Sequence, residues 1–229
     1  MFILGSSLSV LCFEIIAAAV IIAVIAITRH AYRDNTNRAR KVTMRVFLVY
    51  LIWLGILLAL VKSGQMQNLP MQGIPIFFGS VLIISVVAGL SRYGGHLAIQ
   101  TPLAALIAFH AFRLPLELVL HNWTERGTIP TTMIWTGQNW DIIAGALAFA
   151  IWPVAKNRAV AWGFNIIGSL LLLNVLRVAL LSSSLPFGWD TQPPLQLFEH
   201  APYFLIGPVL IGGAITGHII LTRALLRKT

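Results

Sequence analysis

The sequence has almost no cysteine and few acidic residues. Its single cysteine, Cys12, excludes an internal disulfide framework and any paired-cysteine metal or redox motif. Only 10% of the residues are charged, whereas a typical soluble domain carries about a quarter. There are 7 Asp and Glu against 16 Lys and Arg, which gives a formal net charge of +9. The composition is therefore not that of an ordinary soluble domain, and the basic excess needs a topological or binding explanation.

Long apolar runs dominate the sequence instead. Hydrophobic residues make up 58% of the chain, and seven runs approach the length of about 20 residues that a transmembrane helix needs. They are approximately Leu8–Thr28, Val46–Val61, Ile74–Leu90, Leu97–His121, Asn139–Ala155, Val160–Ser183 and His200–Thr222. We therefore predict an all-α polytopic membrane bundle of about seven transmembrane helices, in a single domain over residues 1–229. No internal repeat is found, and no removable signal peptide is expected at the N-terminus.

The basic residues are concentrated in alternate loops. With seven spans, twelve of the sixteen Lys and Arg fall on the side of the membrane that also carries the C-terminus: Arg29, Arg33, Arg38, Arg40, Lys41, Arg45, Arg92, Lys156, Arg158, Arg223, Arg227 and Lys228. The positive-inside rule thus predicts the N-terminus outside and the C-terminus inside, in a bacterial inner membrane. The basic loop after the first span could be a site for anionic lipid or nucleic acid. We interpret it instead as a topology determinant that touches lipid headgroups, and assign its residues no functional role.

The fourth span carries a polar stripe. Steps of three and four residues place four ionisable side chains on one helix face, namely His110, Arg113, Glu117 and His121. Ionisable groups seldom enter a membrane without a function, so we predict that the stripe lines a pocket and that Arg113 pairs with Glu117. An ion pair that only neutralises two buried charges is the alternative. Pro115 removes a backbone donor within the stripe and is expected to kink the helix.

Polar residues also mark the fifth, sixth and last spans. Asn139 and Asp141 begin the fifth span, where an ordinary helix N-cap is an equally good interpretation. Asn174 and Arg177 lie in the outer third of the sixth span. Arg177 could extend to the outer headgroups, but Asn174 on the same face favours a position toward the bundle. His200 begins the last span, after a Pro-rich loop.

Four spans would thus bring polar side chains to the outer half of the membrane. We therefore predict a polar site that is open to the outer face. Cys12 and Glu14 of the first span lie at a similar depth, with no assigned role. His30, His96 and His218 fall at the inner boundary or in inner loops, and we interpret them as structural.

The order of these residues resembles that of the exosortase and archaeosortase membrane transpeptidases. Asn174–Val–Leu–Arg177 is similar to the Asn-x-x-Arg motif of that family, and His200 corresponds to a histidine near the start of its last helix. The resemblance covers roughly residues 127–222. It implies a membrane protein that acts on C-terminally membrane-anchored proteins. The chain departs from the family at the catalytic cysteine, because Asp141 or a neighbour takes that position.

Without a thiolate, cysteine-type transpeptidation is not expected. The remaining residues suit acid–base chemistry, with Asp141 as general base or orienting carboxylate, His200 as acid–base and Arg177 as stabiliser of an oxyanion or phosphate. A zinc or iron site is the alternative, built from some of His121, Asp141, His200 and Glu117. No HxxxH or HExxH spacing supports a metal, and we predict no cofactor.

We therefore expect an exosortase-like integral membrane protein whose Asp141, Arg177 and His200 act on, or bind, a membrane-anchored polypeptide or lipid-linked substrate. The substrate-binding residues would be His110, Arg113, Glu117, His121, Asn139 and Asn174. The alternatives are a non-catalytic binding or assembly protein of the same fold and a small transporter that couples through an Arg–Glu pair. The absence of an inverted repeat disfavours the transporter. Membrane lipids and an anchored protein are the expected partners, and nucleic acid is not.

Overall fold

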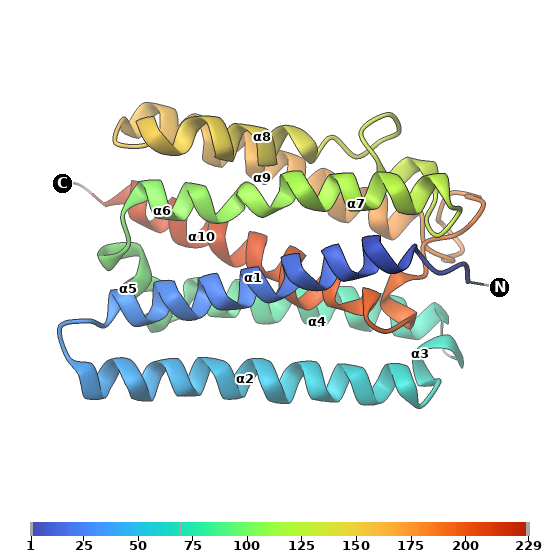
Figure 1. Cartoon of the computed structure of the whole chain (residues 1–229), viewed down its shortest axis with the longest axis horizontal. Helices are drawn as coiled ribbons and strands as arrows, with labels where there is room; N and C mark the ends of the chain where they lie inside the picture. The colour runs from blue at the N-terminus through green and yellow to red at the C-terminus, as the bar shows by residue number, and fades with distance from the viewer. Residues whose placement is uncertain (1, 69, 228–229) are drawn as a thin grey trace.

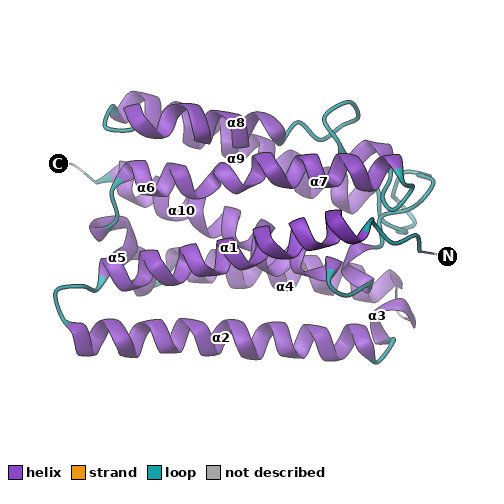
Figure 2. Ribbon diagram, viewed as in Figure 1, coloured by secondary structure: helices purple, strands orange, loops and turns teal. Residues whose placement is uncertain are grey.

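The computed structural model describes residues 2–68 and 70–227, except for the side chains of residues 70–72. These residues form a bundle of roughly parallel and antiparallel helices, and the described ranges contain no β-strand (Figure 1, Figure 2). The longest continuous helices are α1 (Ser7–Ala31), α2 (Thr36–Lys62), α4 (Pro70–Leu90) and α9 (Arg158–Leu181). The fold class predicted from the apolar runs is confirmed.

Two further spans are built from several helical pieces. The fourth span consists of α6 (Leu103–Ala108), a 3-10 turn η1 (Phe109–Phe112) and α7 (Arg113–Glu125). The last span consists of a 3-10 turn η5 (Tyr203–Ile206), a π-helical turn η6 (Gly207–Ile211) and α10 (Gly212–Leu226). The short connecting elements are α3 (Gln65–Asn68), α5 (Arg92–Gln100), η2 (Thr131–Met133) and η4 (Leu197–Glu199).

The break in the fourth span lies directly before Pro115. Proline has no amide hydrogen, so Pro115 cannot donate to the carbonyl of Ala111 four residues earlier. The chain there tightens into the 3-10 turn, and regular helix resumes at Arg113. The structure thus shows a local 3-10 turn ahead of Pro115, and the kink expected from this proline stays a prediction.

Six segments are long and apolar enough to cross a membrane: Ser7–Ala31, Thr36–Lys62, Gly73–Leu90, Leu103–Glu125, Arg158–Leu181 and Tyr203–Leu226. The seventh predicted span, Asn139–Ala155, contains only α8 (Ile142–Ile151) and the 3-10 turn η3 (Trp152–Val154). At 1.5 Å per residue, α8 is about 15 Å long, which is about half of a hydrocarbon core. The chain is thus an integral membrane protein with six full-length spans and one short helix.

Side-chain caps fix where the helices begin at one end of the bundle. Asn35 accepts a hydrogen bond from the amide of Arg38 at 2.9 Å, and Asn157 accepts one from the amide of Ala159 at 2.9 Å. Each cap satisfies an amide that has no partner within its own helix. The caps set the starts of α2 and α9 directly after the basic loops.

The two ends of the bundle differ in charge. Helices run alternately in opposite directions, so the N-terminus and the C-terminus lie at opposite ends (Figure 1). One end, called the basic end below, carries the turns after α1, α4 and η3 and the end of α10, where the predicted cluster of Arg and Lys is found. The other end, called the loop end, carries the long connections 126–141 and 182–202. The predicted grouping of the basic loops at one end is therefore present.

Helix α10 lies at the centre of the bundle and α2 at its edge (Figure 1). Of the most apolar stretch of the last span, 72% is buried inside the protein, whereas only 11% of the corresponding stretch of α2 is buried. The other helices surround α10, and its small residues Gly212, Gly213, Ala214 and Gly217 are all buried. The central position of α10 brings its polar residues into contact with the fourth and sixth spans.

Candidate functional site

Arg113 and Asp141 form a buried ion pair in the middle of the bundle. Arg113 Nε donates to Asp141 Oδ2 at 2.6 Å, and the second guanidinium nitrogen, Nη2, donates to Oδ1. Only 1% of the Arg113 side chain and 7% of the Asp141 side chain are exposed. The predicted pair between Arg113 and Glu117 is therefore wrong. Although Glu117 lies one turn away on the same helix, the bidentate geometry with Asp141, directly before α8, satisfies the guanidinium better.

His218 completes the hydrogen bonding of Arg113. Arg113 Nη1 lies 3.1 Å from His218 Nε2 and 3.4 Å from the carbonyl oxygen of Gly168. Because an arginine can only donate, His218 Nε2 is the acceptor and the ring proton is on Nδ1. That proton is donated to Asn165 Oδ1 at 2.9 Å, and Asn165 Nδ2 donates to Thr222 Oγ1 at 2.7 Å. The geometry therefore assigns a neutral His218.

Sequence reasoning placed His218 at the inner boundary and missed its role. The available signal was Asn165 on the sixth span, a buried amide among apolar residues that needed a polar partner. Gly168 is a second signal, because a Cβ atom there would lie 2.6 Å from His218 Cε1. The glycine allows the ring and the guanidinium to approach α9 closely.

Glu117 and Asn139 form the second half of this buried group. Asn139 Nδ2 donates to Glu117 Oε1 at 2.9 Å and to the carbonyl of Met133 at 3.0 Å. Asn139 Oδ1 accepts from the amide of Asp141 at 3.1 Å, so Asn139 orders the start of α8 and also holds Glu117. Asp141 makes no side-chain cap with α8. Within the described residues, Glu117 Oε2 has no hydrogen-bond partner.

His110 lies beside His218 in the same interior. It is 0% exposed, and its ring centroid is 4.0 Å from that of His218 with an interplanar angle of 30°. Neither ring nitrogen of His110 has a hydrogen-bond partner in the described part of the chain. We call His110, Arg113, Glu117, Asn139, Asp141, Asn165 and His218 the buried polar cluster.

The buried polar cluster is closed. The cavity that touches Arg113, Glu117, Asn139 and Asp141 has a volume of about 30 Å³, enough for about one water molecule. Arg113 lies near the middle of the Leu103–Glu125 span, closer to the centre of the membrane than the outer half predicted from the sequence. Asp141 reaches that depth because the loop before α8 folds inward. A polypeptide or lipid headgroup has no room at this position.

Arg177 lies elsewhere, at the loop end of α9. Its side chain is exposed, and Nη2 donates to Asn174 Oδ1 at 3.0 Å and to Gln138 Oε1 at 3.4 Å. The guanidinium carbon is 5.5 Å from the centroid of the Trp189 ring, a cation–π distance. Asn174 Nδ2 donates to the carbonyl of Gln138 at 2.6 Å. The predicted Asn174 and Arg177 are thus neighbours, but no hydrogen bond or ion pair joins them to Asp141 in the described structure.

His200 is half-buried in the loop end. Its ring stacks on Phe2, with centroids 3.9 Å apart and an interplanar angle of 14°. Burial lowers the pKa of His200 below its usual value, and burial raises the pKa of the adjacent Glu199 to about 7. No interaction links His200 with Asp141 or Arg177 among the described residues. The three predicted catalytic residues therefore occupy three separate environments.

The predicted metal ligands are also dispersed. His121 stacks on Trp135 at 4.5 Å and lies 3.5 Å from Glu125 Oε1, one turn further along α7. Within residues 2–68 and 70–227, no three His, Cys, Asp or Glu side chains come close enough to share a metal ion. The alternative of a metal held by His121, Asp141 and His200 is therefore not supported by the arrangement.

The polar residues of α1 take no part in either site. Cys12 is half-buried against the apolar core, and Glu14 is exposed on the outer surface of α1. The polar groups of α1 that do matter lie at its start, where the Ser9 hydroxyl accepts a hydrogen bond from Trp123 Nε1 at 3.0 Å. This contact packs α1 against the end of α7.

No family model, no curated protein and no solved structure matches the chain. Two groups of residues are candidates for function: the buried polar cluster and the exposed group around Arg177.

Proposed function

We propose that this protein is an exosortase-like integral membrane protein that binds, at its loop end, an anionic group of a membrane-anchored polypeptide or lipid-linked molecule. The observation that carries the proposal is Arg177, an exposed guanidinium with no carboxylate partner among the described residues. It lies beside Asn174 and Trp189, next to the loops that cover this end of the bundle.

The surroundings of Arg177 suit the binding of a carboxylate or a phosphate. Asn174 Oδ1 accepts from both Nε and Nη2, and the Trp189 ring lies 5.5 Å from the guanidinium carbon. These neutral groups orient the planar guanidinium without cancelling its charge. Because Nε and Nη2 already donate to Asn174 and Gln138, Nη1 is the nitrogen that can donate charge-assisted hydrogen bonds to an oxyanion.

Binding fits the arrangement better than acid–base catalysis. The Asp141 carboxylate is already occupied by two hydrogen bonds from Arg113, so it could act as a base only after a buried ion pair was broken. His200 is stacked on Phe2. The chain also lacks a cysteine in the position that the exosortase resemblance requires. We therefore favour a non-catalytic binding or assembly role over a transferase.

The buried polar cluster supports a second candidate, a proton pathway. Glu117 Oε2 and both nitrogens of His110 lack partners in the described chain, and a cavity for about one water lies beside Glu117. Such groups at membrane depth are typical of proton relays. Reconstituted vesicles with a pH-sensitive dye test this candidate, because Glu117→Gln should slow proton entry. Wild-type vesicles as proton-tight as protein-free vesicles would exclude it.

We place the loop end on the extracytoplasmic side of a bacterial inner membrane. The support is the grouping of basic residues at the opposite end, since Lys and Arg accumulate on the cytoplasmic side. A fluorescent protein fused to the C-terminus should fluoresce in the cytoplasm, and alkaline phosphatase fused after Asp190 should be active outside. Reversed reporter signals would overturn the orientation.

The binding proposal is tested by photocrosslinking from the loop end. A photoreactive phenylalanine analogue replaces Trp140, which is 51% exposed and follows Gln138 by two residues. In membranes of cells that produce the protein naturally, the wild-type background should give a discrete adduct, which mass spectrometry identifies as polypeptide or lipid. Arg177→Gln should reduce that adduct at least tenfold, while Arg126→Gln, an exposed arginine at the same end, should leave it unchanged. An adduct that is insensitive to Arg177→Gln contradicts the proposal.

A further inference from the structure

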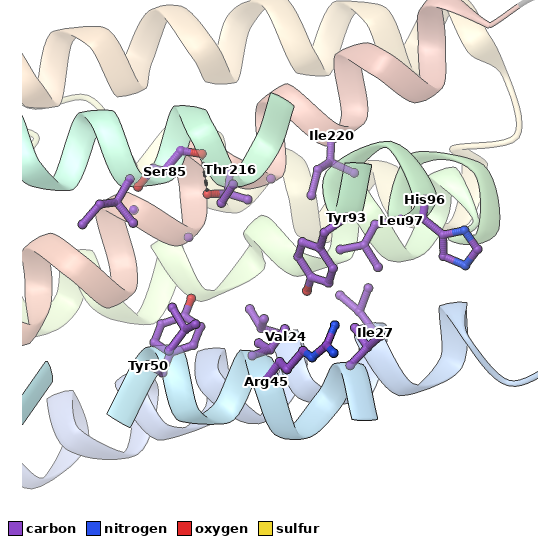
Figure 3. Close-up of a pocket in the computed structure, with 18 of the residues that line it drawn as sticks. Val24, Ile27, Arg45, Tyr50, Ser85, Tyr93, His96, Leu97, Thr216 and Ile220 are labelled. Carbon is purple, nitrogen blue, oxygen red and sulfur yellow. Dashed lines mark hydrogen bonds between the residues drawn. The ribbon is translucent and has the colours of Figure 1, made fainter. Parts of the chain in front are cut away.

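A second cavity extends toward the basic end, and its lining residues Phe109 and Gly217 adjoin the buried polar cluster. It has a volume of about 650 Å³ and is lined by residues of α1, α2, α4, α5 and α10, with two from the α6–η1 segment, Tyr32 after α1 and Pro208 of η6 (Figure 3). None of the seven residues of the buried polar cluster lines it. Its volume falls within the range of roughly 300–1,000 Å³ found for small-molecule sites. We call it the basic-end cavity.

The basic-end cavity carries positive charge only. Its charged lining residues are Arg38, Lys41 and Arg45 of α2 and Arg92 of α5, and no Asp or Glu lines it. None of these four forms an ion pair within the described residues. The guanidinium carbon of Arg38 lies 5.4 Å above the ring of Tyr32, which is itself a lining residue. The charge of the cavity is therefore uncompensated by the protein.

The wall formed by α2 changes from basic to apolar along the helix. Steps of three and four residues put the basic and apolar lining residues on one face, in the order Arg38, Lys41, Val42, Arg45, Val46, Val49 and Trp53. From Arg38 to Trp53 this face extends about 22 Å at 1.5 Å per residue. One leaflet contributes only about 15 Å of hydrocarbon. The face therefore runs from the depth of the headgroups past the end of one leaflet.

The face of α2 that lines the basic-end cavity is not covered by the helices on the other side of the cavity. Helix α2 lies at the edge of the bundle beside α1 (Figure 1), and Ala39, Leu57 and Val61 are its only buried residues among those described. Across the cavity, Ile84, Ala88 and Ile220 present apolar side chains. When the protein is in a bilayer, the apolar part of the cavity would be filled by lipid hydrocarbon.

Hydroxyl and guanidinium groups meet where the basic and apolar parts join. In Figure 3, the side chains of Arg45 and Tyr93 extend into the same space from opposite walls. The Tyr93 hydroxyl is held 2.6 Å from Thr28 Oγ1. His96 is fixed nearby, with Nε2 3.0 Å from the carbonyl of Ala31. Thr28 Oγ1 donates to the carbonyl of Val24, so the Tyr93 hydroxyl donates to Thr28, and His96 Nε2 donates to Ala31. The Arg45 guanidinium is therefore the donor that this level of the cavity offers to a phosphate.

We propose that the basic-end cavity binds one anionic phospholipid of the surrounding bilayer. Its phosphate lies among Arg38, Lys41, Arg45 and Arg92, and one acyl chain follows the apolar face of α2. Membrane topology accounts for basic loops, but it requires neither a cavity nor a basic-to-apolar face directed into it. This site is at the other end of the molecule from Arg177 and does not depend on the function proposed there.

The charge arm of the test compares two arginines on the same helix. The purified protein in an uncharged detergent is titrated with phosphatidylglycerol, phosphatidylcholine or inorganic phosphate, and bound lipid is counted by native mass spectrometry. Phosphatidylglycerol should bind one per chain and at least tenfold more tightly than phosphatidylcholine. Arg45→Gln should weaken it about fivefold, the contribution of one basic residue near an anionic lipid. Arg40→Gln, an exposed neighbour outside the cavity, should bind as the wild type does.

The chain arm tests the apolar face. Val46→Trp fills the cavity and should weaken phosphatidylglycerol binding at least tenfold, whereas Leu48→Trp, exposed outside the cavity, should not. Should Arg45→Gln fail to purify as a monodisperse protein, Lys41→Gln replaces it. Three results would each overturn the proposal. They are an equal loss of phosphatidylglycerol binding in Arg40→Gln and Arg45→Gln, equal binding of phosphatidylglycerol and phosphatidylcholine, and competition by inorganic phosphate for the site as strong as that of the lipid.

Discussion

Removing the charge of Asp141 should destabilise the protein more than any other single loss of a carboxylate. Asp141→Asn keeps the shape of the side chain but leaves the guanidinium of Arg113, 1% exposed, without its bidentate partner. Breaking a buried pair in this way costs about 3–5 kcal/mol because a desolvated charge stays unpaired. The remaining hydrogen bonds of Arg113, to Gly168 and His218, are to neutral groups and cannot replace the carboxylate.

The assay is unfolding by a denaturing detergent, followed by tryptophan fluorescence in mixed micelles. Asp141→Asn should lose about 3–5 kcal/mol of unfolding free energy. The double variant Arg113→Met/Asp141→Leu removes both charges and should recover most of the loss, since apolar replacement of a whole buried pair is often neutral. An Asp141→Asn variant as stable as the wild type would refute the reasoning, because it would mean that water or another group neutralises Arg113.

Glu117 is the group that could take over from Asp141. It lies one turn along α7 from Arg113, and Oε2 has no partner among the described residues. If Glu117 turns toward Arg113 in the Asp141→Asn variant, Glu117→Gln should lower the free energy of unfolding more in that variant than it does in the wild type. Strict additivity of the two changes would show that Glu117 does not compensate.

Two further changes probe the packing and the charge of the protein. Gly168→Ala should destabilise the protein by about 1–3 kcal/mol in the same assay, because the added Cβ would lie 2.6 Å from His218 Cε1. In the control variant Gly163→Ala, on the same helix, the added Cβ meets nothing within 4 Å, so this change should be neutral or slightly stabilising. Equal effects of the two changes would contradict the assigned contact. Burial raises the pKa of Glu199 from 4.5 to about 7, so the folded state binds the carboxyl proton of Glu199 more tightly than the unfolded state does. The contribution of Glu199 to the free energy of unfolding should therefore be complete below about pH 4.5 and be lost as the pH rises through 7. Glu199→Gln should remove that decline, and an unchanged pH profile in the variant would argue against the buried carboxyl.

Composition and charge pattern were enough to predict the bundle and the grouping of its basic loops at one end. Transmembrane helices need long apolar runs because backbone groups cannot stay unpaired in hydrocarbon, so such runs are visible in the sequence itself. The length of the fifth span was not predictable in this way. Asp141 and Asn139 form tertiary contacts with α7, and these contacts draw the preceding loop inward and shorten α8.

The site was predicted in part, because spacing identifies faces but not partners. The stripe of the fourth span correctly identified Arg113, Glu117 and His110 as interior residues. Its local i,i+4 geometry suggested Glu117 as the partner of Arg113, while the fold supplies Asp141 from the residue before α8. Arg177 was expected to face the bundle with Asn174, yet α9 presents it outward beside Trp189. A choice between neighbouring faces of one helix depends on packing that a single sequence does not contain.

The shortness of α8 has a consequence for the lipid around it. Trp140 and Trp152 flank the helix and are 51% and 46% exposed. The 10 residues of α8 between them rise about 15 Å, against about 30 Å for an average hydrocarbon core. Lipids beside Phe149 and Ile143, which face outward from α8, must therefore shorten or tilt. The protein would carry a thinned patch of bilayer on this flank, and a second protein with an equally short hydrophobic edge could relieve the mismatch by docking there.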